Sequence, residues 1–206
     1  MPSAPYNPQD DAGLISSTGA VESRAFVAHY QAADPAVGAV AAVHAAAACA
    51  VTPQVVATGI TNPDFPRVIS ATTAGTNTDV KAVSVIVVGT DAAGAALTET
   101  LPAFTVDTNE TKTGTKAFKT VTQYTVPAMD GTGCTVSIGT GAALGLNHLL
   151  NRNTTITGCT YHSDTREATE PTVTTSATVL ASNTIALNTA LDGSQVDCYY
   201  LVEGDD

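Results

Sequence analysis

Apolar and polar residues alternate in short runs along most of the chain after residue 50. Examples are "RVISATTAG" at residues 67–75 and "VDCYYLVE" at residues 196–203, and clusters of Gly, Asn, Asp and Pro separate the runs. Alternation with a period of two is typical of a β-strand with one buried face. About ten such runs follow one another, as in a sandwich or barrel. The pattern therefore predicts an all-β, antiparallel sandwich or barrel-like domain over residues 36–206.

Two of these runs carry more detailed predictions. "VKAVSVIVVG" at residues 80–89 has apolar residues at both parities, which predicts a central strand covered on both sides. The turn residues "DAAG" and the run "ALTETL" then predict a hairpin. The stretch "VSIGTGAALGLNHLL" at residues 136–150 resembles this hairpin, and either duplication or convergent composition explains the resemblance. "KAFKTVTQYTVPA" is predicted to be one strand, with these residues on one face: Phe118, Thr120, Thr122, Tyr124 and Val126.

Residues 37–51, "VGAVAAVHAAAACAV", admit two interpretations. Alanine is the best helix former, which favours a helix. The absence of an N-cap and of a charged face, together with the interspersed valines, favours a buried strand. Both interpretations stay open from the sequence, with the strand preferred. The only other helical pattern is "LGLNHLLN" at residues 144–151.

The first 35 residues differ from the rest of the chain. They are polar and acidic, show little periodicity, and contain Pro2, Pro5, Pro8 and Pro35. A segment of this kind buries too little apolar surface to offset its own ordering entropy. We therefore predict an extended N-terminal arm over residues 1–35, which becomes ordered only against a partner, followed by the β domain.

Composition supports the β prediction and excludes several partners. The chain has 34 threonines, a β-branched residue that suits a half-exposed pleated surface. Its net charge is −11 with only eight Lys and Arg. Binding to nucleic acid or to an anionic membrane needs clustered cations, so neither partner is expected.

The cysteines and the first residues of the chain indicate where the protein is made. Cys49, Cys134, Cys159 and Cys198 are far apart and form no C-x-x-C pair, so buried free thiols are expected rather than a disulfide framework. "MPSAPYNPQDD" lacks the basic start and apolar run of a signal peptide, and the apolar segment at residues 36–51 is too short to span a bilayer. We expect synthesis in a cytosol.

No motif of catalysis is present in the sequence. There is no G-x-S-x-G, Walker, dinucleotide or H-E-x-x-H pattern. "DGTGCTVSIGTG" at residues 130–141 lacks the lysine of a phosphate loop and is expected to be a glycine-containing hairpin. One stretch, "YHSDTRE", concentrates titratable groups: His162, Asp164, Arg166 and Glu167. It lacks a further metal ligand and a nucleophile, so we expect a polar loop with Asp164 and Arg166 paired across a turn.

The remaining histidines and carboxylates suggest no site. His44 is expected to be packed and hydrogen-bonded, His148 lies in the helical pattern, and His29 in the arm is placed to contact a neighbour. The carboxylates of Asp91, Glu99, Asp107 and Glu110 are spread over hairpin ends. With no Trp and 5% aromatic residues, carbohydrate cleavage or binding has little support. We assign no catalytic, cofactor-binding or metal-ligating residue, and we expect no enzyme.

Several phrases in a fixed order carry a resemblance to a known family. They are "TGITNPDFPRVISAT", "VIVVGTDAAGAALTETL", "TGTKAFKTVTQYTVPAMDGTGCTVSIGTGAALGL" and "REATEPTVTTSATVLASNTIALNTALDGSQVDCYYL", within residues 58–201. This part resembles virion structural proteins of tailed bacteriophages, most closely capsid decoration (cement) proteins. The resemblance implies a β-rich homo-oligomer, such as a homotrimer, that binds the major capsid protein on the capsid exterior and is made in the host cytoplasm.

The resemblance leaves two alternatives open. One is a structural component of the tail (tube, baseplate or fibre), and the other is an Ig-like module that binds the host surface. Location of the protein in the particle separates a head protein from a tail protein, and binding of purified protein to bacterial cells or glycans identifies a host-surface module.

Overall fold

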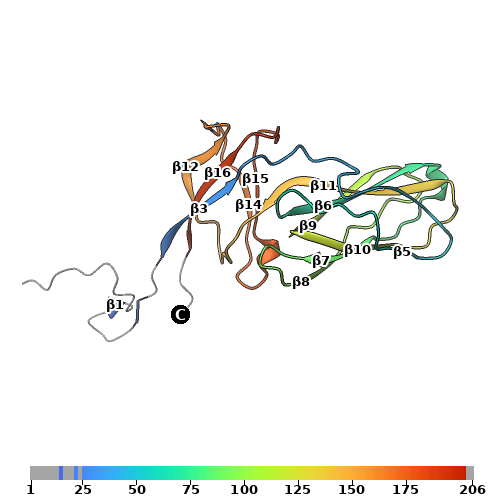
Figure 1. The fold of residues 1–206 in the computed structure, drawn as a ribbon, viewed down its shortest axis with the longest axis horizontal. Helices are drawn as coiled ribbons and strands as arrows, with labels where there is room; N and C mark the ends of the chain where they lie inside the picture. The colour runs from blue at the N-terminus through green and yellow to red at the C-terminus, as the bar shows by residue number, and fades with distance from the viewer. Residues whose placement is uncertain (1–13, 16–20, 23–24, 203–206) are drawn as a thin grey trace, which may run out of the picture.

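The computed structural model describes residues 14–15, 21–22 and 25–202, and this part of the chain is all-β (Figure 1). Strands β3 to β16 form three antiparallel sheets, while β1 (Leu14–Ile15) and β2 (Val21–Glu22) pair only with each other. The described residues contain no α-helix, only the short 3-10 helices η1 (Asn77–Asp79) and η2 (Leu180–Ser182). The predicted all-β antiparallel class is confirmed.

The three sheets are called the first, the central and the terminal sheet. The first sheet has the strand order β5 (Gln54–Val56), β10 (Thr120–Val126), β7 (Ile86–Thr90), β8 (Ala96–Thr100). The central sheet has the order β14 (Thr172–Thr174), β15 (Thr184–Ala186), β11 (Cys134–Gly145), β6 (Arg67–Gly75), β9 (Thr111–Phe118), with β4 (His44–Ala48) also paired to β11. The terminal sheet has the order β13 (Thr165–Arg166), β12 (Thr155–His162), β16 (Val196–Val202), β3 (Phe26–Ala32).

Two clusters of buried side chains hold the sheets together. The larger one packs the first sheet against the central sheet, through residues such as Val87, Tyr124 and Ile138. The smaller one lies under the terminal sheet and includes Tyr30 and Leu144. Strand β11 contributes to both clusters, and Figure 1 shows it running between the end with β12, β16 and β3 and the end with β5 and β10. The twelve-residue strand therefore joins the two halves of the core.

The predicted hairpin at residues 84–101 is present, but its first strand is covered on one side only. Strands β7 and β8 pair from Ile86↔Thr100 to Thr90↔Ala96. The turn is fixed by the Asp91 carboxylate, which accepts the N–H groups of Ala93 and Ala95 at 3.0 and 2.9 Å. Val87 is fully buried, whereas Ile86 is 38% exposed. The prediction of a doubly covered strand is wrong, since no other layer formed by the described residues covers the outer face of β7.

The run at residues 116–128 is two strands rather than one. Strand β9 ends at Phe118 in the central sheet and β10 begins at Thr120 in the first sheet. A register shift between Val121 and Gln123 then changes the inward-facing positions of β10 from odd-numbered to even-numbered residues. Val121 and Tyr124 are buried as a result, and Thr122 is exposed. The predicted common face, with Thr120 and Thr122 beside Phe118, is wrong because the chain changes sheets there.

The alanine-rich run contains a strand, but most of the run is not buried: of its residues, Val43 and Cys49 reach the larger cluster. Only His44–Ala48 form β4, and its alanines are exposed or half-buried. The preceding residues 36–42 have no regular structure and are all exposed. They lie close against β11 because Gly139 lacks a side chain: a Cβ there would lie 2.1 Å from the carbonyl oxygen of Ala39. The pattern at residues 144–151 also forms no helix, since β11 continues to Gly145.

The boundary of the predicted arm moves toward the N-terminus. Residues Phe26–Ala32 form β3, which pairs with β16 along its whole length and buries Ala28, Tyr30 and Ala32. The prediction of an arm over residues 1–35 is wrong for this strand, which belongs to the body. Residues 1–13, 16–20 and 23–24 lie outside the described residues, so the arm prediction is not tested there.

The four cysteines are free thiols, as predicted, and three of them are buried. Cys49 and Cys134 lie opposite each other, because the β4–β11 register continues from Thr135↔Ala48 and the Cys49 N–H donates to the Cys134 carbonyl at 3.1 Å. Both side chains lie in the larger cluster. Burial, and then a hydrogen bond with Cys134, raises the pKa of Cys49 to about 12.

We expect oxidised glutathione to convert this pair slowly into a disulfide. Partners on antiparallel strands have Cα atoms about 4.5–5.5 Å apart, within the range of a disulfide. One cysteine thiolate attacks oxidised glutathione, forms a mixed disulfide and releases one reduced glutathione. The second cysteine then attacks the mixed disulfide, forms the Cys49–Cys134 bond and releases the second reduced glutathione. The reaction is slow because the raised pKa leaves little thiolate. Peptide mapping checks the bond, and Cys134→Ser is the control. A disulfide to Cys159 or Cys198, or none after prolonged oxidation, would contradict this prediction.

Candidate functional site

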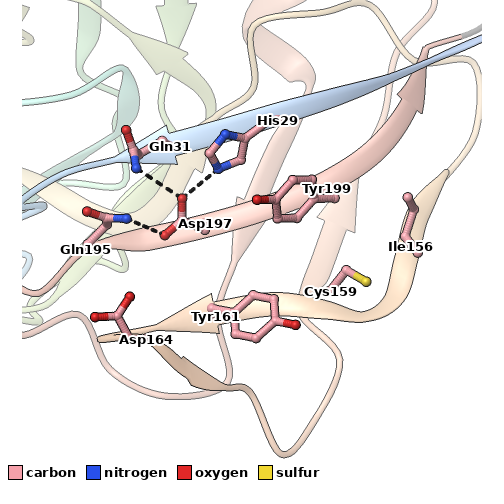
Figure 2. Close-up of a pocket in the computed structure, with 9 residues that line it drawn as sticks. All are labelled: His29, Gln31, Ile156, Cys159, Tyr161, Asp164, Gln195, Asp197 and Tyr199. Carbon is pink, nitrogen blue, oxygen red and sulfur yellow. Dashed lines mark hydrogen bonds and ion pairs between the residues drawn. The ribbon is translucent and has the colours of Figure 1, made fainter.

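A hollow of about 680 Å³ lies on the outer face of the terminal sheet, opposite the smaller cluster (Figure 2). Alternation along the strands builds it: every second residue of β3 and β16 faces the core, and the residues between face outward. The cross-strand pairs Tyr199↔His29 and Asp197↔Gln31 place four side chains in two rows. The full lining is His29, Gln31, Ile156, Cys159, Tyr161, Asp164, Gln195, Asp197 and Tyr199.

Asp197 is the hydrogen-bond centre of the hollow. Its Oδ1 accepts from His29 Nε2 at 2.6 Å and from Gln31 Nε2 at 3.2 Å, and its Oδ2 accepts from Gln195 Nε2 at 2.6 Å. Partial burial alone would raise the pKa of Asp197, but these hydrogen bonds hold it below its usual range. The carboxylate is therefore ionised at neutral pH and fixes the three side chains around it, as Figure 2 shows.

An aromatic stack forms the neighbouring row. The rings of His29 and Tyr199 lie parallel, with their centroids 4.5 Å apart and their planes at 8°. His29 covers one face of the Tyr199 ring. On the other side lies the smaller Cys159, because the register places Thr160 opposite Cys198 and therefore Cys159 beside Tyr199. The short cysteine side chain leaves space between Tyr199 and Tyr161 (Figure 2).

The hollow has no arrangement for nucleophilic catalysis. Cys159 and His29 are separated by strand β16 and the Tyr199 side chain, which is two inter-strand spacings or about 10 Å. A base activates a thiol only within hydrogen-bonding reach. No group of three or more His, Cys, Asp or Glu that could hold a metal ion occurs among the described residues. The groups present are suited to holding a ligand.

The structure disperses the titratable residues of "YHSDTRE". His162 is buried and pairs through Nε2 with Asp192 Oδ1 at 3.0 Å. Asp164 has positive φ in the tight turn between β12 and β13 and lines the hollow. The Arg166 guanidinium lies over Gly158, and Glu167 is buried with its carboxylate accepting from Thr189 N–H. The expected polar turn is present, but the described residues show no ion pair between Asp164 and Arg166, whose guanidinium lies against Gly158 instead. His162 takes its partner from a distant segment.

Most of the other candidate residues hold the fold. His44 and His148 hydrogen-bond to the phenols of Tyr124 and Tyr200 at 2.7 and 2.8 Å, so the expectation of a packed, hydrogen-bonded His44 is confirmed. Asp91 fixes its hairpin turn, and Glu99 accepts from Thr115 N–H at 2.7 Å. Asp107 has positive φ in an exposed loop, and Glu110 pairs with Lys112 at 2.8 Å. The glycine-containing segment at residues 130–141 leads into β11 as a continuous strand, not a hairpin.

Comparisons with known proteins identify no relative. No protein-family model, no curated protein and no solved structure matches the chain. No helix of the described residues is long and apolar enough to cross a membrane.

Sequence reasoning missed the hollow because it placed His29 in the arm and left Asp197 and Tyr199 unexamined within a strand. The signal was present in the alternation: "VDCYYLVE" puts Asp197 and Tyr199 at one parity, and "FVAHYQA" puts His29 and Gln31 at one parity. Outward positions with aromatic and amide side chains, rather than Thr or Lys, distinguish this sheet face.

Proposed function

We propose that this protein is a non-enzymatic structural protein of a tailed-bacteriophage virion, and that it binds the outer surface of the capsid as a decoration protein. The resemblance of residues 58–201 to such proteins supports the proposal. One feature of the structure carries it further: a long, uncharged and apolar stretch of chain lies exposed on the surface.

This apolar ribbon comprises residues 36–48. It contains no Asp, Glu, Lys or Arg, and most of its side chains are exposed alanines and valines. Val37 is 59% and Val40 is 53% exposed. Further along the chain, Val51 and Val55 are each 63% exposed. Contiguous apolar surface of this kind is uncommon on a protein that stays monomeric and marks a surface that a partner covers.

Covering the ribbon gives a modest binding free energy for one copy of the protein, but the sum over all copies on a capsid is large. Each Å² of apolar surface removed from water contributes about 25 cal/mol. A decoration protein repeats its contact at every equivalent position of the capsid, so subunits that are each held by a moderate interface resist opening together. The net charge of −11 keeps the free protein soluble despite the ribbon.

The polar chemistry of the body is consistent with a scaffold. Arg67 is fully buried among backbone carbonyls, and His44, His148 and His162 each have a structural partner. These groups fix the sheets relative to one another. A stiff body that presents one uncharged ribbon is suited to bridging neighbouring capsid subunits.

Reattachment to capsids stripped of this protein tests the proposal. We expect Val40→Glu to weaken binding about tenfold or more, because the contact would bury an unpaired carboxylate. Val106→Glu is the matched control, since Val106 is 51% exposed on a separate loop. Sedimentation of protein with the capsids measures binding, and melting curves verify the fold. Equal binding by both variants, or protein found on tails and not on capsids, would overturn the proposal.

A further inference from the structure

We propose that the hollow on the outer face of the terminal sheet binds a neutral saccharide, a function separate from capsid attachment. The hollow lies on β3, β16 and β12, whereas the apolar ribbon borders β11 of the central sheet. The two surfaces therefore serve two partners, and the saccharide site does not rest on the decoration role.

The charges in the hollow argue against two other classes of ligand. Of the described residues that line it, none is Lys or Arg, while Asp164 and Asp197 are both acidic. A phosphate, a nucleic acid or an acidic sugar would meet carboxylates and neither Lys nor Arg. Both Asp197 oxygens already accept hydrogen bonds, and the Asp197 side chain is only 13% exposed. Of the carboxylates that line the hollow, this leaves the exposed Asp164 for a cationic ligand, and a single exposed ion pair contributes little to binding.

The polar groups that remain match the hydroxyl groups of a sugar. Gln31 and Gln195 donate their amide N–H to Asp197, so Asp197 sets the orientation of both amides and leaves each amide oxygen as an acceptor. In Figure 2 both amide oxygens point away from Asp197. The phenols of Tyr161 and Tyr199 can each donate and accept, and the Asp164 carboxylate accepts. Asp197 is a positioning residue in this arrangement.

The low aromatic content of the whole chain gave carbohydrate binding little support, but the fold gathers Tyr161 and Tyr199 in one hollow, where they supply the apolar half of a sugar site. A sugar ring has C–H groups on its faces and hydroxyls on its rim, so it pairs an aromatic face with polar groups around it. Tyr199 is held upright by the stack with His29, and the side of its ring toward Cys159 borders the open space (Figure 2). Ile156 and Tyr161 border the same space. A volume of about 680 Å³ accommodates more than one sugar ring, which favours an oligosaccharide.

Saturation-transfer NMR of the full chain tests the site with six neutral methyl glycosides: glucoside, galactoside, mannoside, rhamnoside, N-acetylglucosaminide and N-acetylgalactosaminide. We expect at least one to bind with millimolar affinity. Tyr199→Ala should weaken that binding about tenfold, and Tyr199→Phe should weaken it less, because phenylalanine retains the ring. Leu201→Ala is the control, since Leu201 is 40% exposed on the same strand and does not line the hollow.

The outcomes separate the alternatives. Binding that falls in Tyr199→Ala, with the melting temperature and Leu201→Ala binding unchanged, supports the saccharide site. Absence of binding by all six glycosides overturns it, as does equal weakening by Tyr199→Ala and Leu201→Ala. Binding of arginine methyl ester or inorganic phosphate in place of the glycosides would also overturn it. Capsid reattachment by Tyr199→Ala should remain unchanged, so failure here is distinguishable from failure of the decoration role.

Discussion

Replacing Arg67 with alanine is expected to destabilise the body by about 3–5 kcal/mol. The Arg67 side chain is 1% exposed and connects three separate segments. Its Nε and Nη2 donate to the Gly141 carbonyl at 2.9 and 2.6 Å, and its Nη1 donates to the Ala36 carbonyl at 2.9 Å and to Asp64 Oδ1 at 3.1 Å. Removal of the guanidinium leaves the Gly141 and Ala36 carbonyls without this donor and takes from Asp64 its cationic partner, although Asp64 keeps the Ala36 N–H. It also leaves a cavity at the bulge in β11.

Denaturant unfolding of the full chain measures this effect. Lys81→Ala is the matched control, because Lys81 also pairs with a carboxylate (Asp130 Oδ1 at 3.3 Å) but both side chains are about half exposed. An exposed ion pair contributes at most about 1 kcal/mol. Comparable losses in the two variants would show that the buried guanidinium does not hold these segments together.

The same cluster gives the direction of one pH effect. Burial alone would raise the pKa of Asp64, but hydrogen bonds from the Ala36 N–H and from Arg67 hold it below its usual range. A carboxyl whose pKa is lower in the folded state contributes stability that is present above the unfolded-state pKa of about 3.9. This contribution is lost as the pH falls from that value through the lower folded-state pKa.

The sequence was sufficient for the strands whose alternation is complete within one sheet. "RVISATTAG" is β6 residue for residue, and "ALTETL" gives β8 to within one residue. Prediction failed where the chain changes sheets or shifts register. The bulge in β10 changes which of its residues face the core, and it can be predicted only if the pairing with β7 is known. The stretch at residues 136–150 resembled the β7–β8 hairpin, but it passes through a bulge between Thr140 and Leu144 and remains one strand to Gly145.

Exposure and long-range polar contacts were the least predictable properties. The alanine-rich run contains the composition of a core, and nothing local indicates that its side chains face solvent. Arg67 begins a strand and would be expected at the surface, because the carbonyls of Ala36 and Gly141 reach it only in the folded chain. The hollow was unpredictable for the same reason, because it also depends on long-range contacts. Strands β3 and β16 are more than 160 residues apart in the sequence, as the His29–Asp197 separation of 168 shows.

Deleting residues 1–35 is expected to destabilise the protein by at least about 5 kcal/mol, comparable with the whole stability of a domain. The deletion removes β3, which pairs with β16 from Phe26↔Val202 to Ala32↔Val196. It also removes three residues of the smaller cluster, among them Tyr30, which is 3% exposed. Truncation of one large core aromatic alone costs about 3–5 kcal/mol, and the uncovered edge of β16 would lose its backbone partners.

Deleting only residues 1–24 retains β3 and is the matched truncation. We expect this shorter deletion to preserve the melting temperature of the body to within a few degrees, while the longer one melts far lower or is insoluble. A synthetic peptide of residues 25–35, added to the longer deletion during refolding, should restore the terminal sheet by re-forming the β3–β16 pair. Equal melting of the two truncations, or no restoration by the peptide, would show that β3 does not complete the core. Since β3 carries both His29 and Gln31, restoration of the fold by the peptide should also restore saccharide binding, so structure and site are tested on the same strand.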